Sequence, residues 1–449
     1  MAHGQRKIVD ATEGVIWKQL LALFFPLWFG TLFQQLYNTV DSVVVGRFVG
    51  KAALAAVGCT GTVVSLTVGI FAGIASGAVV VIAQQFGARR HERVRESVHT
   101  AMLLGVLLGV FFTVVGYVTA PWVLRAMGTT PDTLADAELY LRVYFLGMVP
   151  NVVYNMGTGV LRAIGDSRRP LYFLIAASLC NIALDLLFVL VFEMGVLGVA
   201  VATVLSQLLS AILVILSLLR AQGQSYQLFP RQLAIEKQSL KAILRLGIPA
   251  ALQSAMYSIS NIVIQAAIND FGTDTVAAWT AYGKTDVVFW MSVSSMGLAI
   301  TTFSGQNFGA GKIDRLKKGV WTSVWLTTLF TIAMSAALTI YARPIMHIFT
   351  PDSAVMEIGA DMVRFLAPTY ITYVLVELLA GAIRGAGKSL APTLITMFGV
   401  CALRLVWLLV AVPLHNTVYM VELSYPITWT VTSAALAIYY YKGRWLNTK

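Results

Sequence analysis

The sequence predicts an all-α polytopic membrane protein, with twelve transmembrane helices in two homologous six-helix lobes. Composition is the first reason: 58% of the 449 residues are hydrophobic and only 12% are charged, whereas about 25% of the residues in a soluble domain are charged. The second reason is that apolar segments long enough to cross a bilayer, which takes about 20 residues, recur along the whole chain. An internal repeat is the third. Together these observations exclude an ordinary soluble globular protein.

Several short motifs occur twice at a constant separation of 222 residues (392 − 170 for the proline pair). A single offset kept over separated motifs indicates that one unit has been duplicated. The matching pairs are Gln84–Ala88 with Gln306–Ala310, Leu161–Ser167 with Ile383–Ser389, and Pro170 with Pro392.

Apolar segments between charge clusters give six predicted spans in each copy. The twelve spans are residues 16–46, 52–86, 97–120, 138–160, 171–191, 197–219, 244–269, 275–308, 319–341, 359–382, 392–413 and 421–441. An even number of spans means that both copies enter the membrane in the same direction, so the lobes should be related by an axis along the membrane normal. We expect lobes at 1–219 and 244–449, joined by a polar cytoplasmic linker at 220–243. Two such lobes favour a protein that moves a substrate by rocking, although duplicated bundles also occur in proteins that transport nothing.

Lysine and arginine are distributed unequally between the two sets of predicted loops. One side carries Arg89, Arg90, Arg93, Arg95, Arg162, Arg168, Arg169, Arg220, Arg231, Lys237, Lys241, Arg245, Lys312, Arg315, Lys317, Lys318, Arg384, Lys388 and both chain ends; the other carries Arg47, Lys51, Arg125, Arg142, Arg343 and Arg364. Because positive loops stay in the cytoplasm, both termini are predicted there, in a cell (plasma or inner) membrane. The net charge of +11 then reflects topology and contact with anionic membrane lipid, and implies no nucleic acid partner.

Catalytic and cofactor signals are weak. The three cysteines stand singly in apolar segments and the five histidines have no ligand spacing, so no metal site is expected. Gly385–Ser389 resembles the end of a phosphate-binding loop, but Ala382 stands where the Walker pattern requires glycine. We therefore expect no enzyme activity and no cofactor, and an ion gradient as the energy source.

Polar residues at membrane depth are the best candidates for function, because a charge at the centre of an inserted helix costs about 2.5–3.5 kcal/mol. The first span carries Gln34, Tyr37, Asn38 and Asp41 at i, i+3, i+4, i+7, which places them on one helix face. Asn181 and Asp185 in the fifth span, Asn151 and Asn155 in the fourth, and Thr203 in the sixth add to this set. If these faces converge, the N-terminal lobe encloses a wet pocket with two carboxyl groups.

Two acids in such a pocket cannot both ionise cheaply, so at least one should hold a proton near neutral pH. A bound cation would favour the ionised form and release that proton. The alternative is that Asp41 lies near the outer surface and pairs with Arg47, although six residues is not an ideal helical spacing. Buried amides such as Asn155, Asn181 and Gln34 also often do no more than bond between helices.

The C-terminal lobe places Lys284, Asp286, Glu377 and Arg404 at membrane depth. Lys284 with Glu377, and Asp286 with Arg404, are the expected interhelical pairs, either structural or gating; all four are also candidates for lining a substrate cavity. In the first span, Pro26 removes a helix hydrogen bond and allows a kink, which is either static or a hinge.

These features together resemble the multidrug and toxic compound extrusion (MATE) family. The residues that carry the resemblance are Leu36–Asp41, Gly46–Gly50, Gln306–Ala310 and Ile383–Gly385. The resemblance covers nearly the whole chain and implies export of organic cations such as drugs and dyes, in exchange for protons or sodium ions. It also implies a cation site at Asp41, Asn181 and Asp185, with Thr203 as a fourth member, and a first helix that bends around Pro26.

One departure from the family pattern favours protons as the coupling ion. Some sodium-coupled members carry a glutamate in the seventh helix, where this chain offers only Gln253, Ser258, Ser260, Asn261 and Gln265. Sodium at Asp41, Asn181 and Asp185 stays open as an alternative. A lipid-linked sugar flippase of the same superfamily is the rival function, but it would be expected to have a cationic cavity. A monomer is expected.

Overall fold

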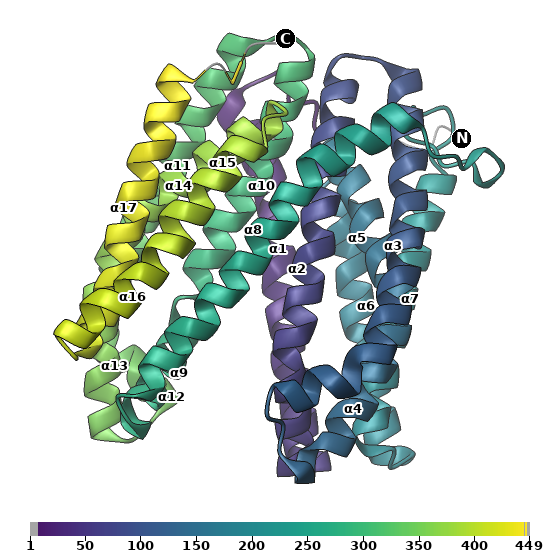
Figure 1. Ribbon diagram of the computed structural model, residues 1–449. Helices are drawn as coiled ribbons and strands as arrows, with labels where there is room; N and C mark the ends of the chain where they lie inside the picture. Colours follow the sequence, from purple (N-terminus) through teal and green to yellow (C-terminus); the bar gives the residue numbers. More distant parts are fainter. Residues whose placement is uncertain (1–7, 444, 447–449) are drawn as a thin grey trace. The chain divides into compact units, whose positions relative to one another are not determined.

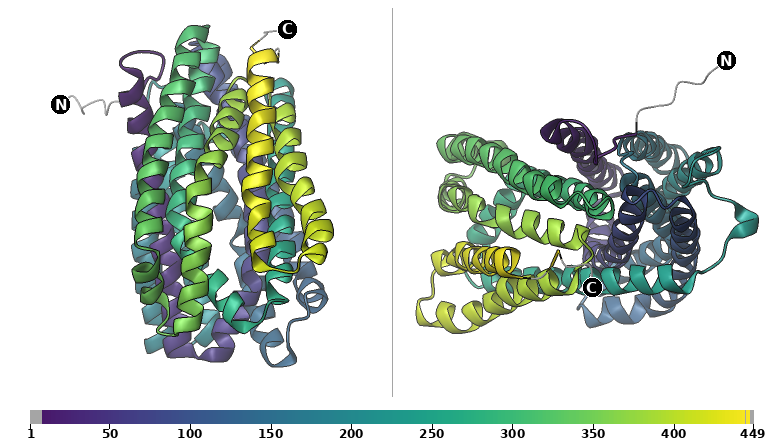
Figure 2. Two further views of the ribbon diagram at one scale, coloured as in Figure 1. Left: turned by 90° about the vertical axis from the view of Figure 1, so that its left-hand side faces the viewer. Right: turned by 90° about the horizontal axis from the view of Figure 1, so that it is seen from above.

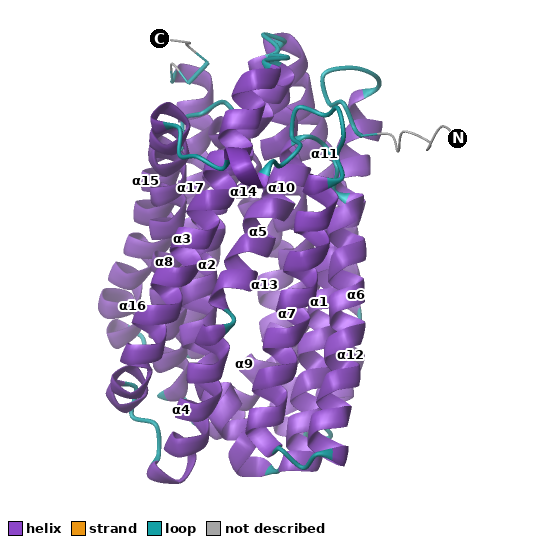
Figure 3. Ribbon diagram, turned by 90° about the vertical axis from the view of Figure 1, so that its right-hand side faces the viewer, coloured by secondary structure: helices purple, strands orange, loops and turns teal. Residues whose placement is uncertain are grey.

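The computed structural model describes residues 8–443, 445 and 446, and this part of the chain contains helices and loops but no strand (Figure 3). The chain ends predicted in the cytoplasm, 1–7 and 447–449, lie outside the described residues. Each of the twelve predicted spans falls within one helix or within consecutive helices.

Seven α-helices cover the first repeat (Figure 1). They are α1 (Ile16–Val44), α2 (Lys51–Gly87), α3 (His91–Ala126), α4 (Pro131–Leu146), α5 (Met148–Ala163), α6 (Arg168–Leu186) and α7 (Gly195–Leu219). Two π-helical segments extend α1 and α6, namely η1 (Val45–Val49) and η2 (Leu187–Val191).

Ten further α-helices cover the second repeat. They are α8 (Lys237–Asn269), α9 (Thr273–Thr285), α10 (Val287–Gly309), α11 (Ile313–Ile340), α12 (Ala342–Phe349), α13 (Ser353–Leu366), α14 (Ile371–Gly385), α15 (Leu390–Thr396), α16 (Leu403–Leu414) and α17 (Val418–Lys442). Three short segments complete the chain: the 3-10 turns η3 (Pro230–Gln232) and η4 (Ala367–Tyr370), and the π-helical η5 (Met397–Ala402).

Nine helical segments within the described residues are long and apolar enough to cross a membrane. The other three predicted spans are also helical, but α4 and α5 are separated at Gly147, while α8 and α17 are long but more polar. Predicted ends are less accurate than predicted spans. α3 begins at His91 and α8 at Lys237, earlier than predicted, because a helix continues into charged turns that an apolar segment does not include.

Contacts divide the chain into two compact units. The first unit contains the described part of Met1–Asp10 together with Phe25–Ala251, and the second contains Ala11–Phe24 and Leu252–Lys449. The first turns of α1 thus belong to the second unit, and the first turns of α8 to the first. Both transitions fall beside a proline, Pro26 in α1 and Pro249 in α8.

Packing within each unit follows the sequence repeat. In the first unit α5 contacts α2, α3 and α7, and α7 also contacts α4 and α6. In the second unit α14 contacts α10, α11 and α17, which run beside it (Figure 2, green to yellow). α4 and α5 together make one predicted span, and successive spans alternate in direction, so the arginine-rich turns before α3 and α6 lie at the same end of the first unit.

The repeated glycine motifs form the same turn in both copies. Gly165 has φ +90° and Gly387 has φ +85°, a left-handed conformation that glycine adopts without a Cβ clash. Behind α5, Gly165 N–H donates to Arg162 O at 2.9 Å and Asp166 N–H to Leu161 O at 2.8 Å. This pattern is a Schellman cap, and the corresponding bonds follow α14. The string at Gly385–Ser389 is therefore a helix-ending turn, as the sequence indicated.

The second repeated motif holds the segment that precedes α1. In the second unit, Gln306 Oε1 accepts from Ala11 N–H at 3.0 Å and Asn307 Nδ2 donates to Ala11 O at 3.1 Å. Arg315 donates to the carbonyls of Ala11, Glu13 and Gly14 at 2.7–3.0 Å. The motif thus fixes the entry of the chain into its first helix.

The connection between α7 and α8 is polar in sequence but packs against α3. Tyr226 and Leu228 are buried, and Phe229 N–H donates to His99 Nε2 on α3 at 3.1 Å. The Phe229 ring also lies under the Arg95 guanidinium, 5.1 Å from its centroid. A few apolar residues within the polar stretch therefore attach it to α3.

Candidate functional site

Asp41 on α1 and Asp185 on α6 face each other inside the first unit. Asn181 and Asp185 lie one turn apart on α6 and expose none of their surface, while Asp41 on α1 is partly buried. The Asp41 carboxyl group lies within hydrogen-bonding reach of the Asp185 carboxyl group. The spacing i, i+4 on α6 is what directs both polar side chains of that helix to one face.

These side chains are not satisfied by their surroundings. Among the described residues, no hydrogen-bond partner is found for Asp41 Oδ1, for either carboxyl oxygen of Asp185, or for either polar atom of the Asn181 amide. Leaving a buried polar group unpaired costs about 1–3 kcal/mol, and more if it is charged. Two facing carboxyl groups can bond to each other only when one holds a proton. The cluster therefore leaves polar atoms that a proton or a cation can bind.

Hydroxyl groups border the acid pair. Thr203 Oγ1 on α7 donates to Val199 O at 3.0 Å and lies within hydrogen-bonding reach of the Tyr37 and Tyr140 hydroxyls. Both tyrosines are close enough to Asp41 and Asp185 to interact with them electrostatically. Carboxyl, amide and hydroxyl oxygens suit a proton or a hard monovalent cation. No group of three or more His, Cys, Asp or Glu within the described chain could hold a metal ion.

Sequence reasoning missed two members of this region, Tyr140 on α4 and Gln207 on α7. Tyr140 stacks on Tyr144 one turn later with a ring-centroid separation of 6.4 Å. Gln207 lies one turn after Thr203 and within hydrogen-bonding reach of the Tyr144 hydroxyl. Tyr140 lies four residues before Tyr144, and Gln207 lies four residues after Thr203. This helical spacing could have indicated both residues from the sequence.

The polar face expected on α1 divides in two. Tyr37 and Asp41 are partly buried, whereas Gln34 and Asn38 are exposed. Within residues 8–443, none of the ion pairs joins Asp41 to the exposed Arg47, so the alternative pair of these two residues is not found. Asn155 is satisfied: its amide donates to Asn151 O and Oδ1, both at 2.9 Å.

Both acids immediately precede irregular helix. η1 begins four residues after Asp41, η2 begins two residues after Asp185, and the two π-helical segments contact each other. A π-helical turn interrupts the regular hydrogen-bond ladder and is frequent at functional sites. Nothing in the residue types of these segments predicted it.

In the second unit the expected ion pairs are wrong. Glu377 Oε1 accepts from Arg384 Nη2 at 3.2 Å, two turns later on the same face of α14, and Lys284 is exposed. The Lys284–Glu377 pair is absent among the described residues because the i, i+7 spacing within α14 supplies a nearer cation. Arg384 also donates to Gln253 Oε1 at 3.4 Å, and the Tyr373 hydroxyl contacts Glu377 Oε2 at 3.5 Å.

Asp286 and Arg404 also find other partners. The Asp286 carboxyl group accepts from Trp290 Nε1 at 2.8 Å. Arg404 donates to Thr428 Oγ1 at 3.1 Å and its guanidinium lies 4.1 Å from the Tyr425 ring centroid. Aromatic side chains, which the charge-based prediction did not consider, contact both groups, while Arg404 Nε has no hydrogen-bond partner among the described residues.

The fold is that of a polytopic, duplicated helical membrane protein. Its sequence matches the MatE family profile twice, over residues 26–187 and 249–410, so the chain belongs to this family. The two matches are offset by 223 residues (249 − 26), which confirms the internal repeat. The fold class predicted from the sequence is therefore correct.

Similar proteins agree with this assignment. The chain is 28% identical over 392 residues to the probable multidrug resistance protein YoeA of Bacillus subtilis, covering 86% of this chain and 84% of the relative. It is 26% identical to the probable multidrug resistance protein YpnP of the same organism over 99% of both chains. A solved outward-facing multidrug resistance MATE family transporter of the MOP superfamily has a TM-score of 0.90 at 24% identity, over 97% of this chain and 98% of that chain.

Proposed function

We propose that the chain is a secondary active antiporter that exports organic cations, including drugs and dyes, in exchange for protons by alternating access. The observation that supports this most is the acid pair Asp41 and Asp185, buried beside Asn181 without described partners for most of its polar atoms. The names of YoeA and YpnP as probable multidrug resistance proteins support the substrate class.

The chemistry of coupling follows from competition for one site. A proton on the acid pair allows one carboxyl group to bond to the other and removes a buried charge. A cation bound near the pair favours the ionised form, and the proton leaves. Because the two occupants exclude each other, each drives the release of the other. Sodium bound at Asp41, Asn181 and Asp185 would couple in the same way and is the alternative ion.

The remaining parts of the proposal concern movement and placement. We assign the hinge to Pro26, which has no N–H for the helix ladder and adjoins the change of unit in α1. The moving lobes are 1–219 and 244–449, connected by 220–243. Both termini lie in the cytoplasm, the membrane is the cell (plasma or inner) membrane, and the protein works as a monomer without a cofactor.

Transport by the purified chain in liposomes tests this function. Ethidium counterflow is measured under a pH gradient and a sodium gradient, each imposed separately. Counterflow driven by protons alone is the expected result. Counterflow driven by sodium alone would identify sodium, and not the proton, as the coupling ion. An absence of ethidium transport by folded protein under either gradient would contradict the proposed substrate class.

A further inference from the structure

The first turns of α8 carry a row of uncompensated positive charge. Lys237, Lys241 and Arg245 are exposed and spaced four residues apart, which places them on one helix face. Among residues 8–443, none of the three takes part in an ion pair. Three cations along about two turns, with no carboxylate partner, favour an anionic ligand.

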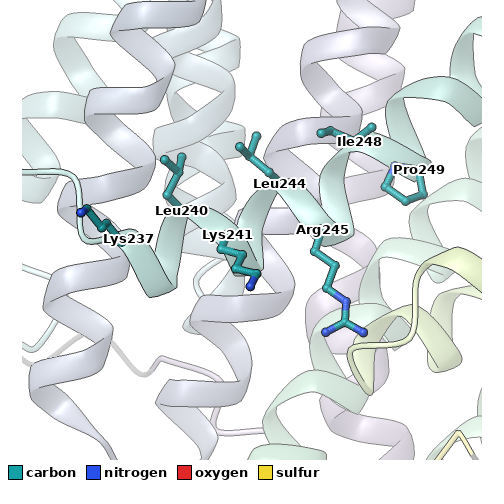
Figure 4. A pocket seen from close by; sticks show the side chains of 7 residues that line it. All are labelled: Lys237, Leu240, Lys241, Leu244, Arg245, Ile248 and Pro249. Carbon is teal, nitrogen blue, oxygen red and sulfur yellow. The ribbon is translucent and has the colours of Figure 1, made fainter.

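A shallow hollow runs along this face (Figure 4). It encloses about 580 Å³ and is lined by the three basic residues together with Leu240, Leu244, Ile248 and Pro249. Leu240 and Leu244 are half-buried and Ile248 is exposed. The hollow therefore offers a basic side and an aliphatic side to the same occupant. None of the residues proposed for cation coupling lines it.

The opposite face of α8 fixes this helix against the rest of the first unit. Glu236 N–H donates to Thr100 Oγ1 at 3.0 Å, and the Ser97 and Ser239 hydroxyls are 3.1 Å apart. Further along, α8 crosses α2 at glycine: a Cβ on Gly247 would come within 2.7 Å of Ile74 Cα. The basic row is thus held in place, and a ligand would not have to order the helix.

The location suits a lipid better than a free anion. The segment before α8 exposes two further apolar side chains, Leu233 and Ile235. α8 itself continues beyond Pro249 into residues 252–269, part of the predicted seventh span. Free phosphate would need the cations but would gain nothing from the aliphatic side, whereas a phospholipid would use both.

We propose that this face binds an anionic phospholipid, with its phosphate-bearing headgroup at Lys237, Lys241 and Arg245 and its acyl chains along Leu240, Leu244 and Ile248. Each basic residue near an anionic headgroup adds to the affinity. The proposed lipid site does not depend on the proposed transport function, because none of the coupling residues lines it.

Native mass spectrometry of the full-length purified chain, titrated with phosphatidylglycerol or phosphatidylcholine, tests the proposal. Lys241→Gln/Arg245→Gln should weaken phosphatidylglycerol binding by roughly tenfold or more, with phosphatidylcholine binding unchanged. Lys317→Gln/Lys318→Gln, two exposed lysines on α11, removes the same charge elsewhere and should leave the affinity as it is. Gel filtration confirms that each variant is folded.

Two further measurements separate a lipid from other ligands. Inorganic phosphate at millimolar concentration should not displace the lipid, and Ile248→Ser should weaken lipid binding although it removes no charge. Displacement by phosphate together with no effect of Ile248→Ser would overturn the lipid assignment. Equal losses in the α8 and α11 double variants would show a general charge effect and no site.

Discussion

The acids considered for function differ between the two repeats in their protein partners. In the first unit Asp41 and Asp185 face each other, and neither oxygen of Asp185 has a described hydrogen-bond partner. In the second unit Glu377 pairs with Arg384, and Asp286 accepts from Trp290. At the position equivalent to Asp185 the second repeat has Trp407, whose Nε1 donates to Met420 O at 2.8 Å. The position equivalent to Glu377 in the first repeat is Asn155, which bonds to Asn151.

This difference separates function from structure within one duplicated fold. A buried acid with a protein partner contributes to the fold, and removing its partner is costly. A buried acid without a protein partner lowers stability unless a proton or another ligand binds it. Because Asp41 and Asp185 are of the second kind, we propose that coupling takes place in the first repeat and that Glu377 and Asp286 have a structural role.

The largest expected effect is the loss of transport in Asp41→Asn. The amide resembles the protonated acid permanently and can neither release nor take up a proton, so proton-driven ethidium counterflow should fall to the rate of protein-free liposomes. Glu377→Gln is the matched control, since it neutralises a half-buried acid in the other repeat. Normal counterflow by Asp41→Asn, or equal loss in both variants, would remove the distinction between the repeats.

Thermal stability should change in opposite directions in the two units. Glu377→Gln leaves Arg384 half-buried without its carboxylate, and we expect a loss of roughly 3 kcal/mol. Asp185→Asn removes a buried acid that has no partner, so its melting temperature in detergent should stay equal or rise. A large destabilisation by Asp185→Asn would mean that this acid is structural after all. Glu377→Leu/Arg384→Met should restore most of the loss, because it removes both members of the pair.

Thr203→Val tests the border of the acid pair with a side chain of the same shape. The variant removes the hydroxyl that Tyr37 and Tyr140 can reach. Losing one hydrogen bond of this kind costs about 0.5–1.5 kcal/mol, so ethidium affinity should fall several-fold while the fold is kept. Thr428→Val, which removes the hydroxyl next to Arg404 in the second unit, should leave ethidium affinity unchanged.

The smallest effect concerns an acid of the first unit that does have partners. The backbone N–H groups of Gln238 and Ser239 hold the pKa of Glu236 below its usual range. The stability that this cap contributes is complete above the ordinary pKa of about 4.5 and is lost as the pH falls through the lower, folded-state value. Glu236→Gln should therefore lower the melting temperature slightly at pH 7 and reduce its decrease below pH 4.5. A melting temperature that falls below pH 4.5 as steeply in Glu236→Gln as in the native chain would contradict this role for Glu236.

Composition and repetition were enough to predict the fold. Apolar segments located all twelve spans, and the pairing of Gly165 with Gly387 anticipated two identical turns, because such features depend on local residue types. The meeting of Asp41 with Asp185 was also anticipated, since each lies on a polar helix face in an apolar span.

What failed depends on contacts distant in sequence. Charge alone suggested that Glu377 would pair with Lys284 and Asp286 with Arg404, but Arg384, Trp290 and Tyr425 were nearer in space. Hydropathy does not indicate which of several possible partners will lie close once the helices have packed. The π-helical segments after Asp41 and Asp185 were missed for a similar reason, because they result from packing and not from residue types.

Proton release on cation binding tests the central claim most directly. Ethidium is added to the purified chain in weakly buffered detergent solution, and the pH change is recorded for the native chain, for Asp41→Asn/Asp185→Asn and for Glu377→Gln. We predict release by the native chain and by Glu377→Gln, and none by the double variant. Undiminished release by the double variant, or its loss in Glu377→Gln alone, would contradict the assignment of coupling to the first repeat.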